Sequence, residues 1–265
     1  LLGIVNFFEP GDMMKTIMIH SLHQGEGKTK IAKELAGYTQ LQGKRALLAD
    51  LDFITEPHSR ALGLPSSPNL QDLLQEITAA AKEKPYFAVQ LGEEKLEQYL
   101  LTHHSGLKVL SSENAKHLAE DEEIAQKIRT VVRNLKQLPY DLMVIDTDSS
   151  NRDYNQAVLE ETDQVLIVMD NFRYNVKDLI LYLHKLQDMD YSTDNFKIVL
   201  NKVPDPVHVT IDEIEKETGL PVIGIVPVLD KTPLPPQETE NVYLNVANPN
   251  NVEFIAAIKK IVDVL

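Results

Sequence analysis

The chain of 265 residues contains no cysteine. Disulfide bonds and metal sites built from thiolates are therefore excluded, and a reducing compartment gains slight support. No stretch approaches the roughly 18 uncharged apolar residues that a membrane span needs. The N-terminus also lacks the charged head and apolar core of a signal peptide. We therefore predict a soluble, cytoplasmic protein without a membrane span.

Basic residues are fewer than acidic ones, and the formal net charge is −14. Broad binding to nucleic acid or anionic lipid depends on Lys and Arg, so we expect no such binding. Four residues of one predicted helix are the best candidate for a local basic patch, although a solvated helix face explains them at least as well. They are Lys127, Arg129, Arg133 and Lys136.

Two patterns of metal and catalytic chemistry are also missing. The eight histidines show no H-x-x-x-H or comparable ligand spacing, so we assign no transition-metal site. The G-x-S-x-G elbow of a serine hydrolase does not occur either.

The stretch TIMIHSLHQGEGKT, residues 16–29, has the order of a phosphate-binding loop: an apolar strand, a turn with glycines, then Lys-Thr. Gly25 and Gly27 would let the backbone approach phosphates, and the following helix would offer free N–H groups. Lys28 is expected to meet the β- and γ-phosphates and Thr29 a Mg²⁺ ion. The first glycine of the usual G-x-x-x-x-G-K-[ST] pattern falls on Leu22. A turn that merely caps a helix is the alternative.

Carboxylates follow two of the predicted strands. Asp50 and Asp52 come after strand 45–49, and Asp146 comes after strand 142–145. The carboxyl ends of parallel strands meet at one edge of a sheet, so we expect these side chains beside the phosphate-binding loop. There they would orient a water molecule or hold Mg²⁺. Ordinary acidic turn residues are the alternative.

Apolar strands alternate with amphipathic helices along the chain. We therefore predict an α/β fold with a doubly wound, mostly parallel, twisted sheet and helices on both faces. The expected strands are 16–20, 45–49, 107–110, 142–145, 165–169, 197–200 and 222–226. The expected helices are 28–42, 69–81, 93–101, 120–138, 176–186, 210–217 and 251–265.

We expect the chain to divide into an N-terminal tail and one large domain. Residues 1–14 are expected to be a linker or the tail of an upstream domain that was removed, because the chain begins with Leu. Residues 15–265 would form a single domain, with a proline-rich loop at 227–236. We expect helix 251–265 to pack on the core rather than lie on a membrane surface.

Four segments, HQGEGKT, LLADLD, LMVIDTD and IVLNK, resemble in order and spacing the ParA/MinD superfamily of deviant-Walker P-loop ATPases. The resemblance covers residues 15–265 and implies a homodimer with ATP and Mg²⁺ at its interface. The implied nucleotide-binding residues are Gln24, Gly25, Glu26, Gly27, Lys28, Thr29, Lys30, Asn201 and Pro227. The implied metal-binding residues are Thr29, Asp50 and Asp146, and the implied catalytic residues are Lys28, Asp50, Asp52 and His23.

The side-chain chemistry of Asn201 by itself also suggests a role in recognising the base. It follows a strand directly, so its amide could read an adenine by a paired donor and acceptor. An asparagine that only forms a turn is the alternative.

The chain departs from the superfamily in three places. His23 stands where the superfamily has its signature lysine, and Gln24 stands where it has the next glycine. Asp148 stands where a proline usually follows the Walker B strand. Histidine reaches less far than lysine and is mostly neutral at pH 7, so we expect slow hydrolysis. The alternative is that Lys30 or Arg152 supplies the missing cation.

Three further segments look like the CpaE/TadZ branch, whose members help to localise Flp/Tad pilus assembly. They are DLDFITEPHSRALGLPSSPNLQDLLQ, HHSGLKVLSS and VTIDEIEKETGLPVIGIVP. This resemblance implies partners in pilus or secretion machinery, and a location at a cell pole or the inner face of the membrane through those partners. One alternative is a bacterial tyrosine kinase of the superfamily, although the last twenty-five residues hold one tyrosine, Tyr243. Another is a scaffold that binds nucleotide without turnover.

Overall fold

The computed structural model describes residues 14–55, 57–113, 115–203, 207–228 and 244–265. Its strands are β1 Lys15–His20, β2 Ala46–Leu51, β3 Leu101–Thr102, β4 Lys108–Leu110, β5 Leu142–Thr147, β6 Gln164–Met169, β7 Phe196–Asn201 and β8 Val222–Val226. Its helices are α1 Lys28–Leu41, α2 His58–Ala61, α3 Leu70–Ala80, α4 Glu93–Glu97, α5 Ile124–Leu135, α6 Asp153–Glu161, α7 Arg173–Asp188, α8 Ile211–Thr218 and α9 Val252–Asp263. The expected linker 1–14 lies almost wholly outside these ranges, as does most of the loop 227–236.

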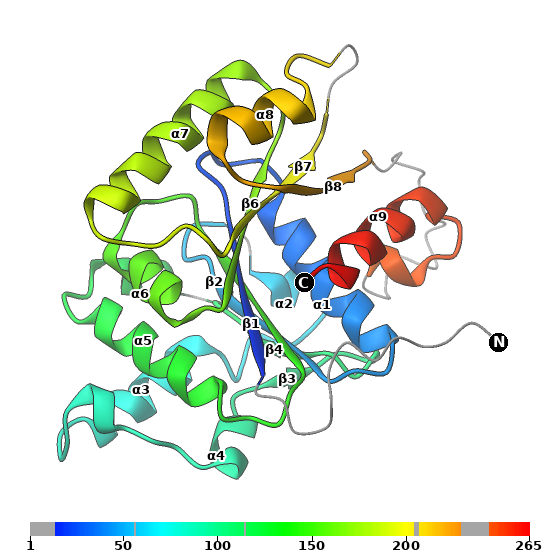
Figure 1. Ribbon diagram of the computed structural model, residues 1–265. Helices are drawn as coiled ribbons and strands as arrows, with labels where there is room; N and C mark the ends of the chain where they lie inside the picture. The colour runs from blue at the N-terminus through cyan, green and yellow to red at the C-terminus, as the bar shows by residue number, and fades with distance from the viewer. Residues whose placement is uncertain (1–13, 56, 114, 204–206, 229–243) are drawn as a thin grey trace.

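The strands form one sheet in the order β3-β4-β2-β5-β1-β6-β7-β8. Within the described chain every neighbouring pair is parallel except β3 and β4. Helices α1 and α9 cover one face, and α3, α5, α6 and α7 cover the other (Figure 1). The predicted doubly wound α/β sheet is confirmed.

Alternation of side chains along each strand builds two separate cores. In β1, Ile17 and Ile19 pack on the α1 side, whereas Met18 packs on the opposite side. Strands buried on both faces must be apolar at every position, which is why they read as continuous aliphatic runs. The register places Asp50 beside Asp146 and Asp146 beside Ile19, so the ends of β2, β5 and β1 meet at one edge.

Several helix boundaries differ from the sequence prediction. The helix expected at 93–101 ends at Glu97, because Leu101 pairs with Val109 in the antiparallel β3–β4 ladder. The helix expected at 120–138 begins only at Ile124. Helices α2 and α6 were not predicted, since both are short and mostly polar. The helix expected at 210–217, by contrast, is present as α8, and Thr210 forms a capping box at its start.

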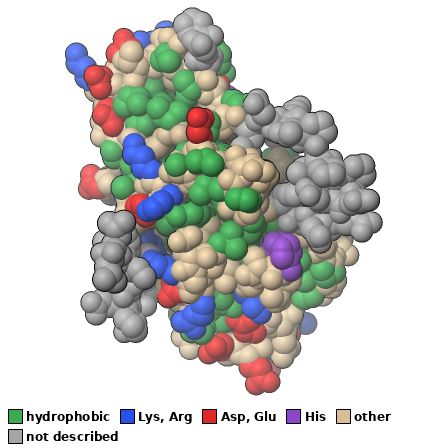
Figure 2. All heavy atoms as spheres, turned by 90° about the vertical axis from the view of Figure 1, so that its right-hand side faces the viewer, with side chains coloured by type: hydrophobic (Ala, Val, Ile, Leu, Met, Phe, Trp, Pro, Cys, Tyr) green, Lys and Arg blue, Asp and Glu red, His purple; other side chains and the backbone are tan. Residues whose placement is uncertain are grey.

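Helix α9 packs on the core, as predicted. Phe254, Ile258 and Ile261 are buried against the α1 side of the sheet, while Val252 at the start of the helix is 68% exposed. Figure 2 shows the face that carries α9, where hydrophobic side chains are mixed with Lys, Arg, Asp and Glu. Among the described helices, none is both long and apolar enough to cross a membrane.

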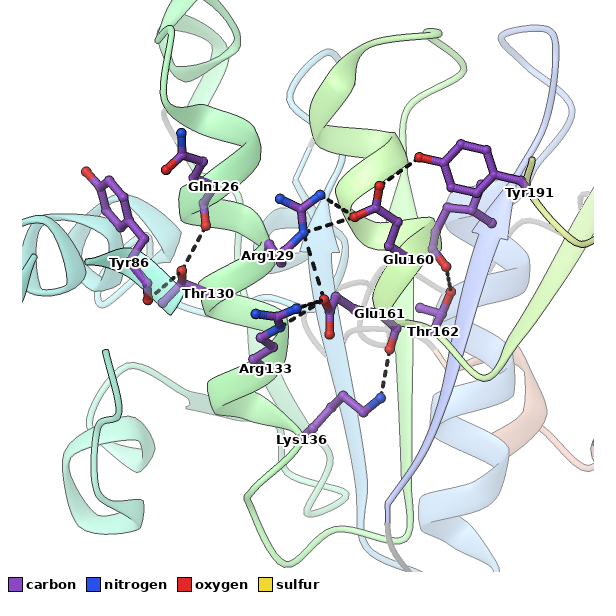
Figure 3. Close-up of polar contacts among 11 residues, drawn as sticks. Tyr86, Gln126, Arg129, Thr130, Arg133, Lys136, Glu160, Glu161, Thr162 and Tyr191 are labelled. Carbon is purple, nitrogen blue, oxygen red and sulfur yellow. Dashed lines mark hydrogen bonds and ion pairs between the residues drawn. The ribbon is translucent and has the colours of Figure 1, made fainter. Parts of the chain in front are cut away.

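The four basic residues of α5 and its C-cap are paired with acidic or carbonyl groups, and Figure 3 shows three of them, Arg129, Arg133 and Lys136. Arg129 contacts Glu160, Arg133 donates to Glu161 at 2.9 Å, and Lys136 donates to the Glu161 carbonyl at 2.8 Å. Lys127 contacts Asp121 at 2.6 Å. Exposed pairs of this kind contribute only about 0–1 kcal/mol each. Their main effect is to neutralise the positive charge, which argues against a basic patch, and Lys127 is buried rather than solvated.

The packing of α9 gives a stability prediction. Ile258→Ala should lower the free energy of unfolding by about 2–5 kcal/mol, because it leaves a cavity beside α1. Val252→Ala on the exposed side of α9 should change it by less than about 0.5 kcal/mol. Urea unfolding of both variants measures the difference. Equal, small losses would contradict the packing of α9 on the core.

Candidate functional site

The loop of residues 21–27, which we call the P-loop, joins β1 to α1 and ends on glycines in the left-handed region. Gly25 has φ 86° and Gly27, the N-cap of α1, has φ 96°. A Cβ on Gly27 would lie 2.3 Å from Nδ2 of Asn201, so a larger residue would also clash. No side chain caps α1, which leaves its first N–H groups available for an anion.

Side chains from the end of β7 bind the carbonyl groups of the P-loop. Asn201 Nδ2 donates to the Glu26 carbonyl at 2.6 Å, and the Lys202 ammonium donates to the Gly25 carbonyl. Because these carbonyls are bound from outside, the loop is held in its observed shape. The structure thus gives Asn201 a task that the sequence did not suggest. Its contact with adenine stays a prediction.

Glu26 ties the P-loop to the segment between β6 and α7. Its side chain is buried and accepts hydrogen bonds from Asn175 Nδ2 and the Asp170 N–H, each at 3.0 Å. Burial, and then the charge of Asp170, raise the pKa of Glu26. The sequence analysis predicted Glu26 only as a nucleotide-binding residue. The sequence does not show that the P-loop lies against Asp170.

Lys28 is buried and its ammonium points to the segment after β5. Lys28 Nζ donates to Ser149 Oγ at 2.8 Å. Ser149 and Ser21 in turn both donate to the His23 carbonyl, at 3.0 and 2.8 Å. The predicted phosphate-binding lysine is therefore held at the strand edge by a serine that the sequence analysis missed.

Asp148, where the resemblance led us to expect a proline, fixes the start of α6. It accepts hydrogen bonds from the Ser150 N–H at 2.7 Å, from Asn155 Nδ2 at 2.8 Å and from the Tyr154 hydroxyl. Burial and this bond to Asp148 raise the pKa of Tyr154. Asp148 thereby sets the backbone that presents its neighbour Ser149 to Lys28.

His23 pairs with α7 of its own chain. Its Nε2 lies 3.0 Å from Asp178 Oδ2, and its ring meets the edge of Tyr174. The two alternative cations contact other groups: Lys30 Nζ lies 4.9 Å from the centre of the Phe254 ring, and Arg152 donates to the Ala119 carbonyl at 2.9 Å.

The predicted carboxylates do come together, and a histidine joins them. Asp50 and Asp146 are register neighbours at the ends of β2 and β5. His58, the first residue of α2, places Nε2 3.0 Å from Asp146 Oδ2 and donates its backbone N–H to Asp50 Oδ2 at 2.9 Å. All three side chains are buried. No sequence spacing signals His58, because the pairing of β2 with β5 and the packing of α2 against them bring the three residues together.

The charges in this cluster perturb one another. Burial raises the pKa of Asp50 to about 6, while the neighbouring His58 opposes that rise. Burial would lower the pKa of His58, but the hydrogen bond to Asp146 and the charges of Asp50 and Asp146 outweigh it, so the pKa of His58 is raised.

Asp52 lies beside the cluster and lines a cavity. Its Oδ1 accepts from the N–H groups of Ile54 and Thr55 at 2.8 and 2.9 Å, while Oδ2 is buried without a partner among the described residues. The cavity measures about 620 Å³ and is also lined by Pro57 and Ser112. Asp52 thus lines this cavity, and its contact with a ligand stays a prediction.

The remaining predicted residues lie around the same edge. Gln24 is exposed, Thr29 is half-buried in the first turn of α1, and Pro227 follows β8, whose last residue pairs with Asn201. The donor set of Asp50 and Asp146 consists of carboxylate oxygens, and Asp146 Oδ1 is buried without a partner in the described chain. Such a set fits a divalent cation such as Mg²⁺.

Comparison with known proteins agrees with this geometry. Residues 14–198 match the AAA_31 family, described as an AAA domain. The chain belongs to this family. A search of curated proteins gives no match.

Solved structures of low sequence identity share the fold of this family member. A ParA family ATPase from Chlorobium tepidum is 20% identical, with a TM-score of 0.74 over 95% of this chain and 97% of that one. A plasmid partition protein from Borrelia burgdorferi, bound to AMPPNP, is 20% identical, with a TM-score of 0.71 over 96% and 100%. MinD from Pyrococcus horikoshii, complexed with Mg-ADP, is 17% identical, with a TM-score of 0.71 over 95% of each chain. The chain therefore has the ParA/MinD fold.

The raised pKa of Asp50 predicts how stability depends on pH. A carboxyl group with a higher pKa in the folded state stabilises the fold when protonated, and this contribution is lost as pH rises from about 4 to about 6. Asp50→Asn should therefore be more stable than the parent at pH 8 by about 1–3 kcal/mol, with little difference at pH 4. Urea unfolding in a chelator at both pH values measures this.

The matched control is Asp188→Asn, which removes an exposed carboxylate at the end of α7. It should show no comparable pH-dependent gain. An Asp50→Asn effect that is the same at pH 4 and pH 8 would contradict the assignment.

Proposed function

We propose that this protein binds ATP with Mg²⁺ at the P-loop, dimerises over the nucleotide and hydrolyses it slowly. The observation that carries the proposal is the uncapped start of α1, where glycines open the backbone and the ammonium of Lys28 lies at the same strand edge. Backbone N–H groups and a lysine are the donors that nucleotide phosphates need.

Within this proposal the residues have distinct tasks. Lys28 binds the β- and γ-phosphates in place of Ser149, and residues 24–30 of the P-loop and early α1 surround them. Thr29, Asp50 and Asp146 hold Mg²⁺, which would neutralise charge on the phosphates. Asp52 faces the cavity and would orient a water molecule. The nucleotides named with two structural neighbours, AMPPNP and Mg-ADP, support the proposal by analogy of fold.

The dimer and the cellular role are finer parts of the proposal. A phosphate site at an open sheet edge can be covered by a twofold-related copy, so we propose a homodimer with nucleotide in the interface. We further propose that the dimer acts in the CpaE/TadZ manner, positioning a pilus or secretion apparatus through protein partners. Three sequence segments support that role, and normal Flp/Tad pili in a deletion strain would refute it.

The first prediction concerns binding. Lys28→Ala should weaken ATP binding by about 100-fold, equivalent to about 2.7 kcal/mol, because a cation next to the phosphates is lost. Calorimetry measures the affinity, and light scattering of the same samples shows whether ATP drives dimer formation. The exposed Lys177→Ala on α7 is the matched control. Unchanged ATP affinity in Lys28→Ala would refute the site, and a monomer at saturating ATP would refute the dimer.

The second prediction separates two roles of Asn201. Loss of its hydrogen bond to the Glu26 carbonyl should loosen the P-loop, so Asn201→Ala should bind ATP and GTP about tenfold less well. If Asn201 also reads adenine, the affinity for ATP should fall further than that for GTP. Equal losses, measured by competition binding, would leave only the role in the loop.

The third prediction concerns hydrolysis. A cation that reaches the transferred phosphate typically accelerates the reaction by about 10³–10⁵. The parent should be slow, and His23→Lys should raise steady-state ATPase activity by at least about tenfold. His184→Lys, at an exposed histidine of α7, is the control. A fast parent whose rate changes in neither His23→Lys nor His23→Ala would show that this position does not govern turnover.

The tyrosine kinase and the inactive scaffold are separated from this proposal by two assays. Tyrosine autophosphorylation with ATP would favour the kinase. Binding and dimerisation without measurable turnover would favour the scaffold.

A further inference from the structure

The cluster of Asp50, His58 and Asp146 has the composition of a metal centre. Each residue offers one ligand atom, and these atoms all lie within 4.8 Å of one another. His58 Nε2 and Asp146 Oδ2, 3.0 Å apart, are close to the roughly 3.3 Å that separates neighbouring ligands on a metal with bonds of about 2.1 Å. Only a small movement of the Asp50 carboxylate is needed to complete the set.

One buried atom of the cluster points to a missing ligand. Asp146 Oδ1 has no hydrogen-bond partner among the described residues, although its side chain is 0% exposed. A buried polar atom without a partner typically costs about 1–3 kcal/mol. Such atoms need a particular explanation, and an ion is one of the few available.

The charge of the cluster favours a dication. With both carboxylates ionised and the imidazole neutral, the buried charge is −2, and one bound proton would still leave −1. Lys33 acts electrostatically on His58, but its ammonium already contacts Glu34 at 3.7 Å. A divalent metal neutralises the whole cluster, which is what a buried pair of carboxylates requires.

The histidine decides which dication fits. Mg²⁺ prefers oxygen ligands and keeps several waters, whereas an imidazole nitrogen suits Mn²⁺, Co²⁺ or Zn²⁺. Hydrogen bonds from the backbone also orient a ligand of the cluster, as is usual in metal centres. Asp50 accepts hydrogen bonds from the N–H groups of Asp52 at 3.2 Å and Ser112 at 3.4 Å.

A path for the metal is present beside the cluster. The 620 Å³ cavity is lined by Asp52, Pro57 and Ser112, and each of these either binds Asp50 or adjoins His58 in the chain. An ion in this cavity is therefore separated from the cluster by only one layer of residues.

We propose that Asp50, His58 and Asp146 form a binding site for a divalent transition metal, occupied without nucleotide and selective for Mn²⁺, Co²⁺ or Zn²⁺ over Mg²⁺. The site uses two residues that we also assign to Mg²⁺ of the nucleotide. It is measured in the absence of ATP, so its failure would leave the ATP proposal standing, and loss of ATP binding would leave this site standing.

The experiment titrates Co²⁺ into the metal-free, nucleotide-free full chain. The parent should bind one Co²⁺ with visible absorption bands of a nitrogen- and oxygen-ligated site, and Mg²⁺ in large excess should not displace it. His58→Gln should weaken Co²⁺ binding by about 100-fold, because one of three protein ligands is lost. His184→Gln and His117→Gln remove exposed histidines, the second at the rim of the cavity, and should bind like the parent.

A second measurement uses thermal unfolding, which also reports whether each variant folds. Mn²⁺ or Zn²⁺ should raise the melting temperature of the parent and of both controls, but not of His58→Gln. No Co²⁺ binding by the parent, equal binding by His58→Gln, or binding only after ATP is added would each overturn the proposal.

Discussion

The P-loop keeps its shape because side chains from distant parts of the chain bind its polar groups. Asn201 and Lys202 bind its carbonyls from the end of β7. Asp170, just after β6, and Asn175, in the first turn of α7, bind the side chain of Glu26. A loop with two left-handed glycines would otherwise sample many conformations. These bonds order it before any ligand arrives, which lowers the entropic cost of binding.

The second constraint is electrostatic. Parallel pairing of β2 with β5 forces Asp50 and Asp146 to be neighbours in a buried place, where like charges repel. A fold selected only for stability would not keep such a pair. The fold tolerates it by adding His58 from α2 and by turning backbone N–H groups toward Asp50. The cost in stability is typical of sites prepared for a cation.

Two of the positions that depart from the expected ParA/MinD pattern, Asp148 and His23, lie in one connected set of residues around Lys28. Asp148 fixes the start of α6, Ser149 holds the ammonium of Lys28, and both Ser149 and Ser21 bind the carbonyl of His23. The His23 side chain is meanwhile paired with Asp178 on α7. A change at one of these positions would therefore be felt at the others through hydrogen bonds, and their energies are not expected to add independently.

The sequence by itself determined the order of the elements and the residues at the strand ends. The continuous aliphatic runs, the glycines before Lys28 and the aspartates after β2 and β5 depend on local rules of periodicity and turn chemistry. Those rules apply before any long-range contact is known. The capping box at Thr210 could be predicted for the same reason.

Only the tertiary structure decided which of these residues touch. His58 is 88 positions from Asp146 in the chain, and Asn175 is 149 positions from Glu26. No local pattern links such pairs, because their contact depends on the order of strands in the sheet and on the packing of the loops at its edge. The same reason explains why Leu101 became part of a strand: its partner across the antiparallel ladder, and not its own helix-like neighbourhood, fixed its conformation.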